Sequence, residues 1–221
     1  MGVVALSALL VAGTGFYLFA RTFPNFKPGM KKLQADLTIL KKELDTLTID
    51  LVPTSTKELE ALSTSQTQNA ARKRFSINGK GVFMTIFEEG LFKYAYREYN
   101  AKRGDLIIMA ETEKRAFAFL GQKGQIKIVI DDQVMGIYDM ATKVLQSPKN
   151  KRMIAQIDSS SAEQDLLKIK GRDVASMNKL SKVDAKSLSK RVFEYVVDRL
   201  SAEERAIIVA VTIFELVTLH D

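Results

Sequence analysis

The chain has 221 residues, and its 33 lysines and arginines against 26 aspartates and glutamates give it a formal net charge of +7. It contains no cysteine and a single histidine, His220, which is the next-to-last residue. These counts exclude thiol nucleophiles, thiolate metal sites and disulfides, and they disfavour a histidine-based catalytic triad or a multi-histidine metal site.

The first segment, residues 1–20, contains no charged side chain, and Arg21 ends the apolar run. A helix of this length spans roughly 30 Å, the thickness of the hydrocarbon core of a bilayer. We therefore predict a retained transmembrane anchor over residues 1–21. A cleaved secretory signal is the alternative, but no positive charge precedes the run and Leu18 fits poorly into a small-residue cleavage site.

Positive charges follow the apolar segment, and none precedes it. The basic residues of this flank are Arg21, Lys27, Lys31 and Lys32. Lysine and arginine close to a membrane span stay on the cytoplasmic side. The sequence therefore predicts a single-pass membrane protein with its N-terminus outside and its large C-terminal part in the cytoplasm.

Residues 22–53 are expected to contain a juxtamembrane amphipathic helix that ends before Pro53. Its apolar residues follow one another in steps of three and four, the spacing of a coiled-coil seam. The seam positions are Leu33, Leu37, Leu40, Leu44 and Leu47. Two interpretations stay open: the seam packs on the folded domain or the membrane surface, or it joins two copies of the chain.

Residues 54–75 are predicted to form a short helix followed by a polar linker. Ser55 and Glu58 have the spacing of a capping box, and the run 63–68 is polar and without periodicity. Three consecutive basic residues precede the first predicted strand: Arg72, Lys73 and Arg74. We interpret them either as a solvated loop or as contacts to anionic lipid headgroups.

The remainder, residues 76–221, is predicted to be a β-rich domain. Short segments rich in β-branched and aromatic residues follow one another, and residues 91–99 alternate as a half-buried strand does. Asp131 and Asp132 are typical of a hairpin turn, and no third oxygen ligand lies at a spacing that suits a metal site. Many short strands joined by tight turns favour an antiparallel sheet that closes or folds over on itself.

The chain ends in a predicted helix over residues 202–219. Ser201 and Glu204 form a capping-box pattern at its start. The helix is apolar on nearly all of its faces, so it should be buried, and it is short for a membrane span. The predicted fold class is therefore α+β: two N-terminal helices, then a many-stranded antiparallel barrel-like sheet around a buried C-terminal helix.

This pattern resembles the tubby-like superfamily, which includes tubby C-terminal domains, LURP-one-related proteins and phospholipid scramblases. The resemblance covers residues 76–221 and is carried by the hairpin IVIDDQVMGI (128–137) and by the start of the terminal helix, LSAEE (200–204). It implies a barrel around a central helix that binds phosphoinositides or other anionic lipids, or serves as a scaffold. The chain lacks the cysteine cluster that is acylated in scramblases.

The sequence displays no recognisable catalytic, cofactor or metal site, so we expect a protein without enzymatic activity. Its positive charge favours anionic partners, and the predicted anchor favours a membrane surface over nucleic acid. The expected function is binding of anionic lipid headgroups, or scaffolding of partners, at the membrane. The alternative is a structural subunit of a larger membrane complex, or of a homo-oligomer, in which the anchor and the leucine seam are assembly surfaces.

Overall fold

The computed structural model describes residues 29–73, 76–100, 105–179 and 190–219. The predicted anchor over residues 1–21 lies outside these ranges, and so do Lys27, Arg74 and His220. Within the described ranges, no helix is both long enough and apolar enough to cross a bilayer.

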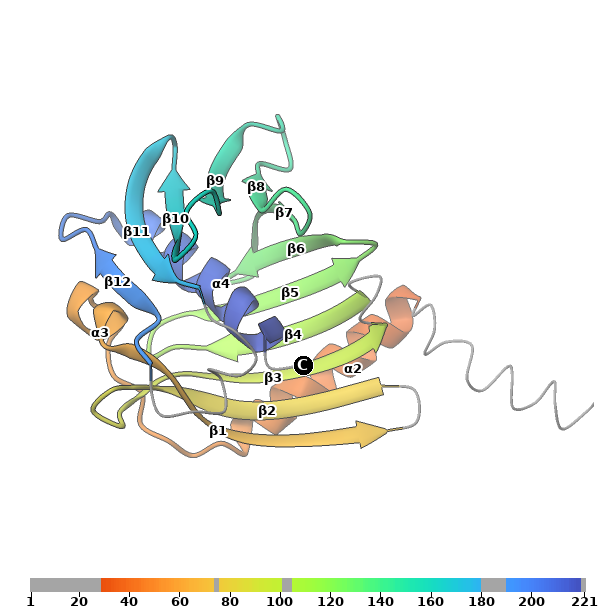
Figure 1. Cartoon of the computed structure of the whole chain (residues 1–221). Helices are drawn as coiled ribbons and strands as arrows, with labels where there is room; N and C mark the ends of the chain where they lie inside the picture. Colours follow the sequence, from red (N-terminus) through yellow and green to blue (C-terminus); the bar gives the residue numbers. More distant parts are fainter. Residues whose placement is uncertain (1–28, 74–75, 101–104, 180–189, 220–221) are drawn as a thin grey trace, which may run out of the picture.

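Twelve strands form one antiparallel sheet in which each strand pairs with the next along the chain (Figure 1). The strands are β1 (Leu62–Lys73), β2 (Ser76–Thr85), β3 (Gly90–Asn100), β4 (Asp105–Glu111), β5 (Ala116–Gln122), β6 (Gln125–Ile130), β7 (Gln133–Asp139), β8 (Val144–Gln146), β9 (Met153–Asp158), β10 (Gln164–Ile169), β11 (Arg172–Asn178) and β12 (Phe193–Val196). Because all neighbours are antiparallel, the short connections between them alternate between the two ends of the sheet.

The first and last strands of the sheet approach each other and nearly close it into a barrel. An antiparallel bridge joins Ser63 to Arg191, and beside it the Val192 N–H donates to the Leu62 carbonyl over 2.8 Å. The prediction of a many-stranded, antiparallel, barrel-like sheet is therefore confirmed.

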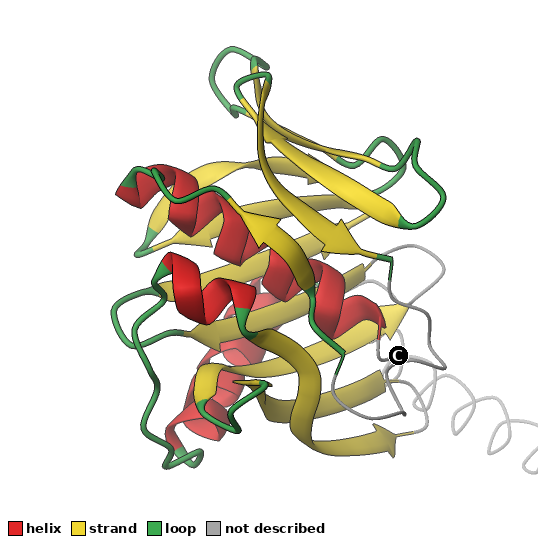
Figure 2. Ribbon diagram, turned by 60° about the vertical axis from the view of Figure 1, so that its left-hand side comes forward, coloured by secondary structure: helices red, strands yellow, loops and turns green. Residues whose placement is uncertain are grey.

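The C-terminal helix α4 (Ala202–Leu219) lies inside the curved sheet (Figure 2). Its capping box is formed in both directions: the Glu204 N–H donates to Ser201 Oγ over 3.1 Å, and the Ser201 N–H donates to Glu204 Oε2 over 2.8 Å. Residues 206–214 are all buried, and the Thr212 hydroxyl is satisfied by the Ile208 carbonyl at 2.8 Å. The predicted bounds and burial of this helix are confirmed.

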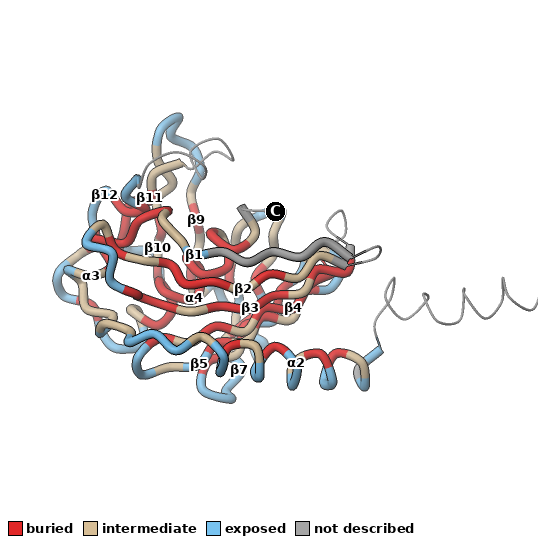
Figure 3. The backbone as a smooth tube through the Cα atoms, turned by 90° about the horizontal axis from the view of Figure 1, so that it is seen from below, coloured by how far each residue is buried: buried red, intermediate tan, exposed pale blue. Residues whose placement is uncertain are grey.

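The amphipathic helix α2 (Met30–Asp45) packs on the outer face of the barrel, and its opposite side is exposed (Figure 3). Leu33, Leu40 and Leu44 form a buried cluster with Ala95, Tyr99 and Ile107 of β3 and β4. Since Leu40 and Leu44 are fully buried within the single chain, contact with a second copy would require α2 to leave the sheet. Self-association through these leucines therefore stays a prediction, and it would require the loss of the packing between α2 and the sheet.

One part of the sequence interpretation is wrong: the polar run 63–68 is not a solvated linker but lies within β1. Strand pairing uses backbone groups, and polar side chains are tolerated where they find partners, as Ser63 does by donating to the Met84 carbonyl over 3.0 Å. The sheet therefore begins at Leu62, upstream of the predicted boundary at residue 76. The short helix α3 (Thr56–Glu60) is present, but Ser55 makes no side-chain capping bond to it.

The hairpin between β6 and β7 turns at Asp131 and Asp132, as the sequence predicts. Both residues have positive φ angles, 48° and 64°, which two-residue hairpin turns of type I′ require. The Asp131 carboxylate also accepts a hydrogen bond from the Ala116 N–H at 3.0 Å and pairs with Arg115 at 3.0 Å. The two aspartates therefore have a structural role in this turn.

Candidate functional site

The helices α2 and α4 begin at opposite ends of the barrel. We call the end at which the odd-numbered strands β1 to β11 finish the proximal end, and the opposite one the distal end. α2 begins at the proximal end, because Asp36 in its second turn bonds to Arg97 and Tyr99 near the finish of β3. α4 begins at the distal end, where Glu204 pairs with Arg172 at the start of β11 over 2.7 Å, and it runs toward the proximal end.

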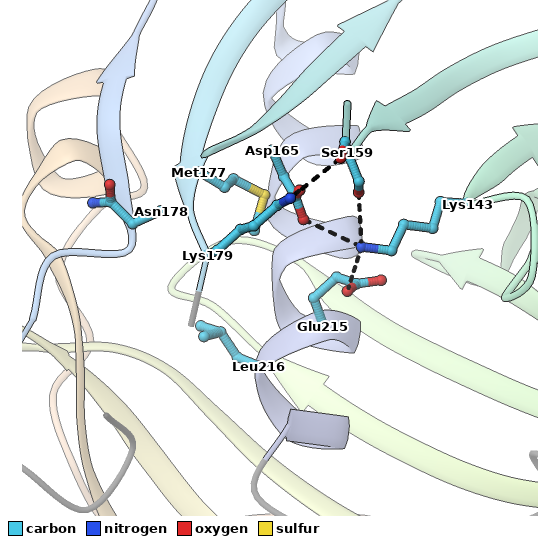
Figure 4. Close-up of a pocket in the computed structure, with 8 residues that line it drawn as sticks. All are labelled: Lys143, Ser159, Asp165, Met177, Asn178, Lys179, Glu215 and Leu216. Atoms are coloured by element: carbon cyan, nitrogen blue, oxygen red, sulfur yellow. Dashed lines mark hydrogen bonds and ion pairs between the residues drawn. The ribbon is translucent and has the colours of Figure 1, made fainter. Parts of the chain in front are cut away.

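A cavity of about 400 Å³ lies at the proximal end, where α4 finishes (Figure 4). The turn after β7, the segment after β9, the start of β10, the finish of β11 and the last turns of α4 all contribute to its lining. The lining residues are Lys143, Ser159, Asp165, Met177, Asn178, Lys179, Glu215 and Leu216. We call this the proximal cavity.

Lys143 holds three of these elements together by its ammonium group. Its Nζ lies 3.2 Å from Ser159 Oγ and 3.2 Å from Asp165 Oδ2, and 4.0 Å from Glu215 Oε2. Figure 4 shows that these side chains converge on the same space from two connecting segments, from β10 and from α4. The arrangement therefore places one cation at the centre of the cavity wall.

Lys179 contributes a second cation, which lies beside Asp165. Its Nζ donates to the Ser159 carbonyl over 3.2 Å and to the Ser161 carbonyl, but lies 3.7 Å from Asp165 Oδ1, too far for a hydrogen bond. Asp165 Oδ1 is buried and has no hydrogen-bond partner among the described residues. A buried acceptor without a donor costs free energy, so this oxygen is suited to accept a donor from a ligand.

Glu215 places a carboxyl group between the cavity and the barrel interior. The Tyr138 hydroxyl donates to Glu215 Oε1 over 2.7 Å, and 27 % of the Glu215 side chain remains exposed. Burial raises the pKa of Glu215, although Tyr138 and Lys143 act in the opposite direction. Burial and the nearby Glu215 charge also raise the pKa of the Tyr138 hydroxyl, so it remains a donor. The raised pKa of Glu215 shifts the charge of the lining toward positive.

The pH dependence of stability tests this environment through the variant Glu215→Gln. A raised pKa means that the folded protein keeps a proton that the unfolded chain has lost, so Glu215 lowers the free energy of unfolding as pH rises above the ordinary value of 4.5. We expect the variant to gain stability relative to the wild type across this rise, because it lacks the carboxyl group that loses its proton. The amide oxygen of the new side chain still accepts a hydrogen bond from Tyr138. Urea denaturation at pH 4, 5.5 and 7 measures the difference in the free energy of unfolding between the two proteins. A difference that does not grow with pH would contradict the raised pKa.

The lining of the proximal cavity combines hydrogen-bond donors with an acceptor. Lys143 and Lys179 offer donors to a negatively charged group, and Asp165 offers an acceptor to a hydroxyl or an amine. Nowhere in the described residues do three or more histidine, cysteine or acidic side chains converge as metal ligands do. The site therefore fits a polar ligand that combines an anionic group with a hydrogen-bond donor.

Four of the predicted basic residues lie in the described ranges, all at the proximal end of the barrel but outside the cavity. Lys31 and Lys32 are in the first turn of α2, and Lys32 pairs with Asp36 at 3.3 Å. Arg72 and Lys73 are the last residues of β1, so they also lie at the proximal end. The seam leucines lie against the outer face of β3 and β4, as described above.

The cavity residues themselves were missed by sequence reasoning. Lys143, Asp165 and Lys179 lie in separate turns and strands, and no spacing links them. The one signal was Glu215, a carboxylate that interrupts an otherwise apolar helix. In comparisons with protein families, with characterised proteins and with solved structures, the chain shows no significant similarity to any of them. Its function therefore has to be inferred from the site.

Proposed function

We propose that the protein is a non-enzymatic, single-pass membrane protein whose cytoplasmic barrel binds the headgroup of an anionic lipid in the proximal cavity. One observation supports the proposal: the cavity lies at the end of the barrel at which α2 begins. Because the predicted anchor precedes α2 in the chain, this is the end that we place next to the bilayer.

The length of the connection limits how far this end of the barrel lies from the membrane. Arg21 and Met30 are nine positions apart, with eight residues between them. A fully extended chain of that length reaches about 30 Å. Basic residues at the proximal end add an attraction to an anionic surface of about 1 kcal/mol each. These residues are Lys31, Lys32, Arg72 and Lys73.

The lining of the cavity selects among headgroups. A phosphate accepts hydrogen bonds from Lys143 and Lys179, and a headgroup hydroxyl or amine supplies the donor that Asp165 Oδ1 lacks. Inositol and serine headgroups carry both kinds of group, whereas choline carries no such donor. The resemblance to the tubby-like superfamily implies the same class of ligand. We include membership of this superfamily in the proposal.

Calorimetric titration of the full chain in detergent with short-chain lipids tests the proposal. We expect dioctanoyl phosphatidylinositol phosphate or phosphatidylserine to bind and dioctanoyl phosphatidylcholine not to bind. The double variant Lys143→Gln/Lys179→Gln should weaken binding by at least about tenfold, because two charge-assisted hydrogen bonds are lost.

The matched control is Lys149→Gln/Arg152→Gln, which removes the same charge from exposed residues at the distal end. Equal weakening of lipid binding in both double variants would show that binding depends only on net charge. The proximal cavity would then not be the headgroup-binding site. The alternative function, an assembly subunit of a larger membrane complex, predicts no headgroup selectivity in the same titration.

A further inference from the structure

A second cavity, of about 320 Å³, lies at the distal end of the barrel. It is bounded by the first two turns of α4, the segment before α3, the turn between β4 and β5, and the hairpin turn after β6. Its polar lining comprises two hydroxyls, three cations and one carboxylate: Thr54, Thr112, Lys114, Arg115, Arg205 and Asp131. We call this the distal cavity, and its formal charge is positive.

Arg205 is the unusual member of this set. Its Nε is buried and has no hydrogen-bond partner among the described residues. The two acidic residues beside it in α4 are engaged elsewhere, since Glu204 pairs with Arg172 at 2.7 Å and Glu203 lies 3.8 Å from Lys170. A buried guanidinium N–H without an acceptor is costly, and an anionic ligand would supply that acceptor.

The other two cations are weakly or partly neutralised. Arg115 pairs with Asp131 at 3.0 Å, and both side chains are more than one-third exposed. Lys114 is largely exposed, and its one ion pair among the described residues is with its neighbour Glu113, at 3.7 Å. Such exposed pairs contribute little and break readily, so Arg115 and Lys114 remain available to a ligand.

We propose that the distal cavity binds a small phosphorylated molecule from solution, held by Arg205, Arg115 and Lys114. Arginine presents a planar fork of donors that matches phosphate oxygens, and Phe117 and Val209 offer an apolar wall to an organic group. Arg205 and Glu215 are ten residues apart on α4, which separates the two cavities by about 15 Å. That the ligand comes from solution rests on the proposed function, which puts the membrane at the opposite, proximal end.

Calorimetric titration of the full chain in detergent with inorganic phosphate and with glycerol 3-phosphate tests this site. We expect both to bind, and Arg205→Gln to weaken binding by about tenfold or more. Arg172→Gln is the control, because Arg172 contacts the same turn of α4 through Glu204 but does not line the cavity. It should bind phosphate as the wild type does.

A second variant tests the site in the opposite direction and does not disturb the fold. Asp131→Asn removes the negative charge beside Arg115, so phosphate should bind several-fold more tightly. The new side chain still accepts from the Ala116 N–H, and asparagine tolerates the positive φ of 48° at this position. If Arg205→Gln fails to fold, Lys114→Gln takes its place as the test. Lys114 is exposed, and its replacement should weaken phosphate binding.

The outcomes separate this site from the proximal cavity. Phosphate binding that Arg205→Gln weakens, and that Lys143→Gln/Lys179→Gln leaves unchanged, supports the inference. Absence of phosphate binding by the wild type, or weaker binding by Asp131→Asn, would overturn it. If dioctanoyl phosphatidylinositol phosphate binds through Arg205 and free phosphate does not bind, the ligand of the distal cavity is a lipid headgroup. The inference of a dissolved ligand would then be wrong.

Discussion

Replacing Phe214 by alanine is expected to lower the free energy of unfolding by about 3–5 kcal/mol. The ring, on α4, is only 2 % exposed and packs against β5 and β7: its centroid is 6.2 Å from that of Phe119 and 5.5 Å from that of Tyr138, with an edge contact to the tyrosine. Truncation leaves a cavity at the centre of the barrel, where α4 and the sheet interlock. Urea denaturation followed by circular dichroism measures the loss.

Phe87 supplies the matched control, because it lies in the turn between β2 and β3 and is 70 % exposed. Phe87→Ala removes the same atoms but should change stability by less than about 0.5 kcal/mol. A cost at Phe214 as small as that at Phe87 would mean that the terminal helix does not support the barrel.

Replacing Asp36 by alanine is expected to cost about 3 kcal/mol and to release α2 from the barrel. Asp36 is 3 % exposed and accepts hydrogen bonds from Arg97 and from the Tyr99 hydroxyl, while Lys32 lies 3.3 Å away. Without Asp36, the largely buried Arg97 keeps, within the part of the chain that the structure describes, its side-chain hydrogen bond to Asn78 at 3.0 Å and no acidic partner. An uncompensated buried charge is what makes the loss of one partner of an ion pair expensive.

Amide hydrogen exchange distinguishes release of the helix from general destabilisation. We expect Asp36→Ala to reduce protection in α2 more than in β5 and β6, whose pairing does not involve α2. Asp45→Ala, which removes an exposed carboxylate at the end of the same helix, should leave the protection of α2 close to that of the wild type. Unchanged protection of α2 in the Asp36 variant would contradict its role.

The elements that the sequence predicts best are those whose local pattern agrees with their surroundings. α4 has a capping box and an apolar surface all round, and these properties require burial wherever the helix lies. β1 was missed because its residues 63–68 are polar, and periodicity detects a strand only where one face is apolar. In β4 the pattern is apolar without alternation, because α2 covers Ile107 on one face while Ile108 faces the interior of the barrel.

The site was harder to predict because tertiary structure alone assembles it. Lys143 and Lys179 are 36 residues apart, and Glu215 is 36 residues further on, yet all three line the proximal cavity. No local rule connects the turns at one end of a barrel until the order of the strands is known. The seam of α2 is a similar case, since its spacing predicts an apolar partner but not whether that partner is the barrel or a second chain.

Fluorophores on single cysteines can report which end of the barrel lies next to the membrane, because the chain has no cysteine of its own. Single cysteines are introduced by Ala141→Cys, in the exposed turn at the proximal end, or by Lys149→Cys, in the exposed turn at the distal end. Each is labelled with a fluorophore, and the full chain is reconstituted into liposomes that carry nitroxide on the lipid headgroups. Strong quenching at position 141 and little at position 149 is the result expected of a proximal cavity that faces the bilayer. Equal quenching at both positions, or stronger quenching at 149, would contradict it.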